Sequence, residues 1–176
     1  LEILAESVKN SDLIKKPDEK ARQLAWAARI IVQAGDQVKA VSQFERARLL
    51  ARASEKPADA IYALYQVACE YAEANLNTQA VEISGELHTL VTNPENEVDT
   101  ASELINIAEL YFETGQETAA EQVLGEALLL ASENKDLWFK IERLIEIVWV
   151  YIKAGQPEKA DKLLPDISAG LNQIEE

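Results

Sequence analysis

Apolar positions along the chain repeat with a period of 40 residues. Shifting the sequence by that distance aligns four ungapped copies, which begin at residues 21, 61, 101 and 141. Within each copy the apolar residues fall three, four and seven positions apart, a spacing that places them on one face of an α-helix. A register held without gaps indicates structural repeats. The most regular columns consist of leucine and of alanine: Leu24, Leu64, Leu104 and Leu144, and Ala40, Ala80, Ala120 and Ala160.

Each copy predicts two helices joined by a tight turn. In the third copy, Leu104, Ala108 and Tyr111 share the inner face of the first helix. Ala120 and Leu124 begin the inner face of the second. The short connection makes the two helices antiparallel neighbours, and alanine lets their backbones approach closely. One column between the helices suits the left-handed conformation that follows a helix end: Gly35, Asn75, Gly115 and Gly155.

A single helical hairpin cannot bury both of its apolar faces, so successive hairpins must stack. The sequence therefore predicts one all-α solenoid domain over residues 1–176, with repeats at 21–60, 61–100, 101–140 and 141–176. Leu1–Asn10 fits the register of the second helix of a preceding, truncated repeat, which leaves residues 1–20 as that trailing helix and a linker. The chain contains no methionine, so we expect it to be a piece of a longer protein.

The columns resemble those of the tetratricopeptide repeat. That family places a large apolar residue, a small one and an aromatic on the first helix, then alanine, a large residue and alanine on the second. The third and first copies show this pattern as Leu104, Ala108, Tyr111, Ala120, Leu124 and Ala127, and as Leu24, Ala28, Ile31, Ala40, Phe44 and Ala47. The resemblance implies a right-handed α-α superhelix whose first helices line a concave binding face. The sequence departs from the family in its 40-residue period, against about 34 residues, in Ser84 and in Pro165.

Composition and charge narrow the range of partners. Hydrophobic residues make up 48% of the chain, while glycine (6) and proline (5) are scarce, as in helical proteins. No apolar run approaches the length of a membrane span. The net charge is −14, and residues 57–134 hold 15 acidic residues without one lysine or arginine. Because such a surface repels phosphate groups, nucleic acid and anionic lipid are disfavoured as partners.

Few residues could carry chemistry. His88, the only histidine, lies one position beyond an inward-facing leucine, so a surface histidine is the simpler interpretation. Cys69, the only cysteine, excludes an internal disulfide, and no other histidine is present to activate it as a nucleophile. The segment "NPENEVD" at 93–99 lacks the central glycine and closing glutamate of a calcium loop. We therefore expect no enzyme activity, no metal and no cofactor.

The columns opposite the hairpin core on the first helices form the candidate binding surface. They would be polar on a helix with a single buried face, yet most of their positions are apolar or aromatic. Two interpretations stay open: burial between adjacent first helices, or an apolar groove for a peptide or helix. The candidate partner-binding residues are Tyr62, Tyr65, Cys69, Glu73, Ile105, Glu109, Phe112, Glu113, Ile145, Trp149 and Ile152.

Acidic residues border this surface, so we expect a protein or peptide partner with basic residues beside an apolar anchor, bound less tightly as salt rises. The favoured function is a non-catalytic protein–protein interaction module or scaffold. The alternative is a structural or assembly protein that self-associates through the ends of the solenoid, the basic first third meeting the acidic middle of another copy. A soluble protein is expected; the sequence does not determine its compartment, and the cytoplasm is favoured.

Overall fold

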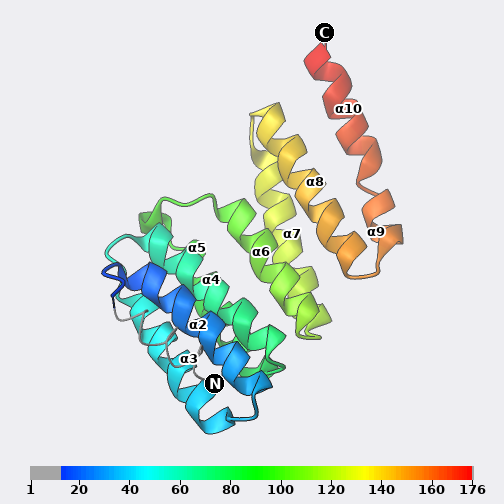
Figure 1. Ribbon diagram of the computed structural model, residues 1–176. Helices are drawn as coiled ribbons and strands as arrows, with labels where there is room; N and C mark the ends of the chain where they lie inside the picture. Colours follow the sequence, from blue (N-terminus) through cyan, green and yellow to red (C-terminus); the bar gives the residue numbers. More distant parts are fainter. Residues whose placement is uncertain (1–12, 176) are drawn as a thin grey trace. The chain divides into compact units, whose positions relative to one another are not determined.

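The computed structural model describes residues 13–175. Within that range the chain forms helices and turns and contains no strand. Figure 1 shows these helices following one another as antiparallel hairpins. The predicted all-α class is confirmed for this part of the chain. Leu1–Asn10, for which the sequence predicts a trailing helix, lies outside the described residues.

Each copy contains a first and a second helix. The first helices are α2 (Pro17–Gln33), α4 (Pro57–Glu73), α6 (Thr100–Glu113) and α8 (Leu137–Lys153). The second helices are α3 (Gln37–Arg52), α5 (Asn77–Val91), α7 (Glu117–Glu133) and, in two parts, α9 (Pro157–Asp161) and α10 (Leu164–Glu175). A short 3-10 helix, η1 (Pro94–Asn96), follows α5. Local sequence sets several helix starts: proline opens α2, α4 and α9, and the side chains of Asp99 and Asp136 cap α6 and α8.

The helices divide into two compact units, Leu1–Glu97 with α2 to α5 and Val98–Glu176 with α6 to α10. The boundary falls between the second and third copies, inside the single domain that the repeat predicts. In each unit the two first helices pack on one another, α2 against α4 and α6 against α8. The second helix of the earlier copy also packs on the first helix of the later one. Each unit therefore contains one complete junction between adjacent copies.

The turns inside the hairpins adopt the predicted left-handed conformation. Their φ angles are +88° at Gly35, +59° at Asn75, +77° at Gly115 and +72° at Gly155. In the third copy, the N–H of Gln116 donates to the carbonyl of Tyr111 at 2.7 Å, and that of Gly115 donates to the carbonyl of Phe112 at 3.0 Å. The other three turns repeat this pair of hydrogen bonds. These bonds satisfy carbonyl groups that a helix end would otherwise leave without partners.

The leucine and alanine columns are buried in all four copies, as predicted. The rings of Phe44 and Tyr71 stack with centroids 4.1 Å apart, which joins α3 to α4. In the second copy Ser84 takes the position of Phe44, and its buried hydroxyl donates to the carbonyl of Ala80 at 2.9 Å. The serine therefore enters the core with its hydrogen-bonding group satisfied.

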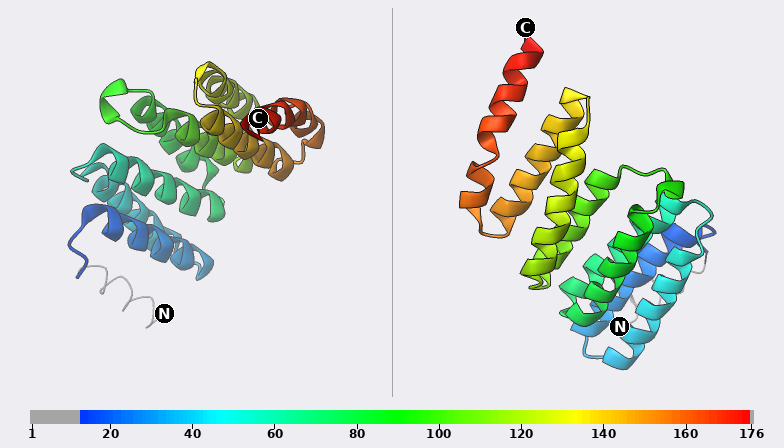
Figure 2. Two further views of the ribbon diagram at one scale, coloured as in Figure 1. Left: turned by 90° about the horizontal axis from the view of Figure 1, so that it is seen from above. Right: turned by 180° about the vertical axis from the view of Figure 1, so that it is seen from behind.

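The second helix of the last copy is broken at a proline. Pro165 has no N–H to donate, and its ring would clash with the carbonyl four residues earlier; α9 accordingly ends at Asp161. The following helix α10 runs alongside α8 (Figures 1 and 2). The break changes which side chains face the core. Leu164, which the repeat register places in a core column, is exposed, whereas Ile167 stays buried like Ala47 and Ala127 of its column, and Gly170 is buried as well.

The turn glycines predict a stability difference between two glycine-to-alanine substitutions in the same unit. Gly115→Ala forces a side chain into the left-handed region and should cost about 1 kcal/mol in the free energy of unfolding. Gly125 lies in the middle of α7 with open space around it, so Gly125→Ala should gain about 0.5–1 kcal/mol. Urea denaturation of the two variants measures both values. Equal effects would show that the turn does not need its left-handed residue.

Candidate functional site

The outer face of α8 exposes three large apolar side chains. Ile145, Trp149 and Ile152 are 39%, 58% and 46% exposed. Their spacing of four and then three residues places them on one face of the helix. We call these three residues the α8 stripe. Large apolar side chains grouped together in water mark a site of contact more often than a plain surface, and all three belong to the set that the sequence predicts.

A pocket of about 460 Å³ lies between α6 and α8, beside the carboxyl-terminal end of the stripe. Trp149 and Ile152 neighbour its lining residues along α8. The ring of Phe112, which is half-buried, meets that of Tyr151 edge-on with centroids 6.4 Å apart. The stripe and the pocket therefore form one surface of α6 and α8. The lining residues are Glu109, Phe112, Glu113, Val150, Lys153 and Ala154.

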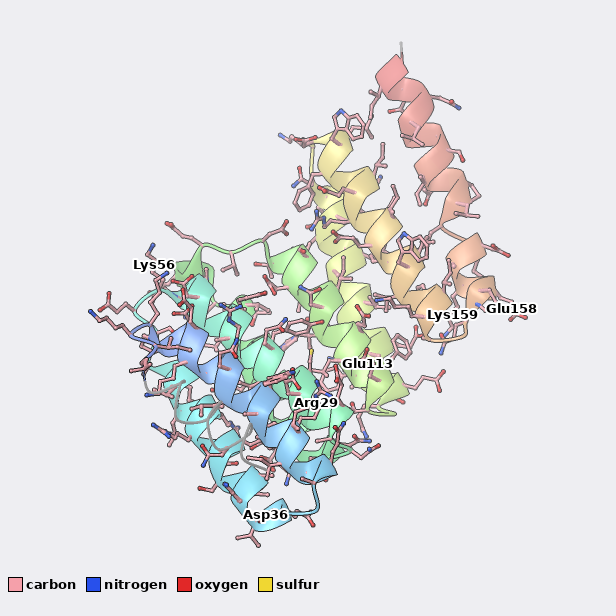
Figure 3. All side chains as sticks on the ribbon, viewed as in Figure 1. Arg29, Asp36, Lys56, Glu113, Glu158 and Lys159 are labelled. Carbon is pink, nitrogen blue, oxygen red and sulfur yellow. The ribbon has the colours of Figure 1, made fainter. Side chains whose placement is uncertain are left out.

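The lining of this pocket carries two carboxylates and one ammonium group. The Lys153 Nζ atom lies 2.5 Å from Glu109 Oε1. That hydrogen bond, with a smaller contribution from the charge of Glu113, raises the pKa of Lys153. Figure 3 labels Glu113, the last residue of α6. The lining of the pocket therefore combines acidic side chains of α6 with a basic side chain of α8.

The candidate residues of the other unit lie on α4. Tyr62 is exposed, and the Arg22 guanidinium of α2 lies over its ring, 5.1 Å from the centroid. Tyr65 and Cys69 are half-buried, and Glu73 is exposed. The predicted set is thus divided, with Tyr62, Tyr65, Cys69 and Glu73 in the first unit and the other residues in the second. The second unit holds the α8 stripe, and we take its surface as the candidate site.

Ile105 requires a correction, because it is only 3% exposed and belongs to the core. It stands in the same repeat column as Ala25, which is buried, and Ile145, which is exposed. Because α4 packs on α2 and α8 packs on α6, this column faces the next first helix within each unit. Among the described residues no further first helix follows α8, and Ile145 remains exposed.

Basic residues of the outer copies pair with the acidic residues of the base-free stretch 57–134. Arg29, labelled in Figure 3, contacts Glu70 and Glu73 at 2.5 and 3.1 Å across α2 and α4. Arg52 contacts Glu86 at 2.6 Å across α3 and α5. Further pairs of this kind are Arg48 with Glu82 and Glu86, Arg143 with Asp99, Lys153 with Glu109, and Lys159 with Glu121.

Sequence analysis missed these ion pairs, although they follow the repeat. Hydrogen-bonded partners such as Arg29 with Glu70 and Lys153 with Glu109 lie 41 and 44 residues apart, close to one period. A search for bases and acids about one period apart would have found them. Glu73 and Glu109, which the sequence predicts to attract a basic partner, each already contact a cation of this chain.

The residues considered for chemistry lie apart from this surface. His88 and Cys69 are half-buried on α5 and α4. In the segment 93–99, the Asn93 side chain caps η1 and the Asn96 amide donates to a carbonyl of α5 at 2.7 Å. Within the described part of the chain, no group of three or more histidine, cysteine, aspartate or glutamate residues is placed to hold a metal ion. No helix in residues 13–175 is both long and apolar enough to cross a membrane.

These observations define an all-helical protein built of tandem antiparallel hairpins. A scan against models of protein families finds no match, and neither does a search of curated proteins. Among solved structures, the chain is similar to the crystal structure of BtubC (BKLC) from P. vanneervenii, with a TM-score of 0.51 and 16% sequence identity. The match covers 98% of this chain and 89% of that one. At this identity the likeness concerns the fold alone, and it supports the tandem helical arrangement.

The two isoleucines of one column should respond differently to truncation. Ile105→Ala removes a buried side chain and should cost about 2–5 kcal/mol in the free energy of unfolding. Ile145→Ala makes the same change on the exposed face of α8 and should cost less than about 1 kcal/mol. Denaturant unfolding of both variants measures the difference. A large loss for Ile145→Ala would assign the stripe to the folding core.

Two glutamates should affect stability with opposite pH dependence. Burial of Glu86 opposes ionisation, but hydrogen bonds and charge from Arg52 and Arg48 outweigh it, so its pKa lies below the ordinary 4.5. Glu86 therefore stabilises the fold above pH 4.5, and this contribution is lost as pH falls through the folded pKa. Burial raises the pKa of Glu103, despite a hydrogen bond from Asn106, so its ionised form destabilises the fold at neutral pH.

The corresponding glutamine variants test these signs. At about pH 7, Glu86→Gln should be less stable than the wild type and Glu103→Gln more stable. Both differences should shrink near pH 3, where the free carboxyl groups become protonated. Unfolding curves at the two pH values, measured in parallel for all three proteins, give the comparison. Differences that persist at low pH would exclude ionisation as their cause.

Proposed function

We propose that this chain is a non-catalytic protein–protein interaction module whose first helices hold a peptide or helix. The observation that carries the proposal is the α8 stripe, Ile145, Trp149 and Ile152. Its three columns are buried or half-buried in each of the first three copies. On α8 the same columns are exposed and apolar.

The size of the stripe indicates what kind of partner it can hold. Full burial of one large apolar side chain is worth about 1.5–3 kcal/mol, and roughly half of this surface is already covered. The stripe alone therefore offers about 2–4 kcal/mol, which is no more than the cost of bringing two molecules together. A bound partner must therefore add contacts beside the stripe, so we infer a helix or an extended segment rather than a single side chain.

The pocket defines the chemistry expected beside the apolar anchor. Two of its lining residues, Glu109 and Glu113, are acidic, so a basic side chain of the partner would be favoured there. Glu109 already contacts Lys153 of this chain, which limits what an incoming base can gain. We therefore infer an apolar anchor with one basic neighbour, and binding that weakens only modestly as salt rises.

We further infer that the hairpins belong to the tetratricopeptide-like class and build its right-handed superhelix. The left-handed turn residues, the buried alanine column and the aromatic residue that closes each first helix from the second copy onward support this inference. The fold likeness to BtubC, which spans 98% of this chain, is compatible with it. In this class the first helices line the concave face.

A selection from a library of displayed peptides tests the function. Wild-type protein should enrich peptides that carry apolar anchors with a basic neighbour. Trp149→Ala should weaken their binding at least about tenfold, which corresponds to about 1.4 kcal/mol. Leu129→Ala removes an apolar side chain of similar exposure, 57%, from α7 of the same unit, and should bind them as the wild type does.

Two outcomes would contradict the proposal. A selection that enriches no peptide sequence over repeated rounds would leave the stripe without an external ligand. Peptides that bind Trp149→Ala and Leu129→Ala equally well would place the binding surface elsewhere on the molecule. Circular dichroism of both variants, which should match the wild type, shows that neither change alters the fold.

A further inference from the structure

We propose that the α8 stripe binds helix α2 of a second molecule of this protein, so that molecules associate head to tail. The inference rests on the proposed interaction function of the α8 stripe and adds to the peptide partner a second one, which uses the stripe but not the acidic pocket. It follows from a comparison of the two junctions between first helices inside the units with two faces, one on α2 and one on α8, against which no other described first helix packs within the same unit.

The two internal junctions have the same geometry. In the first unit, Arg29 of α2 contacts Glu70 and Glu73 of α4. In the second unit, Glu109 of α6 contacts Lys153 of α8. Arg29 and Glu109 occupy equivalent positions in their copies, and so do Glu73 and Lys153. In both junctions the column of Arg29 and Glu109 therefore meets the column of Glu73 and Lys153 on the next first helix, and in the first junction it also meets Glu70.

The same column on α8 holds Trp149 instead of a charged residue. Ile145 and Ile152 flank it along the helix, and all three are exposed. A first helix that docked on α8 as α4 docks on α2 would therefore meet an apolar surface. The internal junctions place a cation opposite a carboxylate at this point, whereas α8 offers nothing for a charge to pair with. The column equivalence thus predicts an uncharged face on the incoming helix.

Helix α2 presents such a face. Ile30 stands where α4 has Glu70, and Gln33 stands where α4 has Glu73 and α8 has Lys153. Trp26, one helical turn before Ile30, is 42% exposed. Gln33 is exposed as well, and Ile30 is half-buried. The face of α2 that corresponds to the docking face of α4 and α8 is therefore uncharged at all three positions.

The two faces match each other in chemistry and in register. If α2 of a second molecule docks on α8 as in the internal junctions, Trp149 of the first molecule would meet Ile30 and Gln33 of the second, with Trp26 one turn away. Each molecule carries one α8 face and one α2 face. The contact is therefore heterologous and forms open linear assemblies rather than a closed dimer. Because the junction is apolar, it should persist at high salt. This differs from the charge-driven self-association that the sequence predicts.

Complementation between two variants tests the junction. Trp149→Glu blocks the α8 face and Trp26→Glu blocks the α2 face, and both changes affect exposed residues. For the wild type, the average mass in sedimentation should rise with concentration beyond that of a dimer, equally at about 0.05 and about 0.5 M NaCl. Each variant alone should remain a monomer. Their equimolar mixture should form dimers and nothing larger, because one intact pair of faces remains.

Each other result would overturn the inference. A wild type that stays monomeric from micromolar to millimolar concentration excludes self-association. If it also binds selected peptides in a Trp149-dependent way, the proposed function stands and only the partner is wrong. Association that Trp149→Glu abolishes and Trp26→Glu leaves intact indicates a symmetric contact between two α8 faces. Failure of the two folded variants to form dimers when mixed excludes the complementary junction. Circular dichroism of each variant establishes that it is folded.

Discussion

The packing of one first helix against the next is the contact on which the other features of this protein depend. A hairpin held together by its alanine column still carries apolar residues on the far side of its first helix. Within each unit the following first helix covers them, as Ala25 and Ile105 show. The same column on α8 keeps its apolar residue, Ile145, without such a cover in the described chain. Repetition of a buried pattern thus produces an exposed surface, and we assign the function to that surface.

The features that the sequence predicts well are those that depend on local geometry. A residue past a helix end must adopt a left-handed conformation whatever surrounds it, so Gly35, Asn75, Gly115 and Gly155 identify the four turns. The alanine column is equally local, because two antiparallel helices joined by a short turn must approach closely at one point. Burial of these columns follows directly from the repeat.

The features that the sequence does not determine depend on neighbouring copies. Ile105 and Ile145 share a column and a residue type, yet only one is exposed, because a first helix packs against α6 on that side and none does so on α8 in the described chain. Pro165 could be recognised as a disruption, but the exposure of Leu164 and the burial of Gly170 against α8 require the position of α10. The net charge of residues 57–134 predicts an acidic surface for a basic partner. Basic residues about one repeat away, however, pair with several of these acidic residues. A one-dimensional count of charge does not include these pairings.

The central claim, that one repeat column is covered inside the protein and open on α8, can be measured directly by thiol labelling. Cysteine would replace Ile105 in one protein and Ile145 in another, with Cys69 changed to serine in both. At low concentration, the thiol at position 145 should react nearly as fast as a free cysteine, while that at position 105 should react only as fast as the fold opens. Equal protection at the two positions would show that α8 has no open face and would contradict the account.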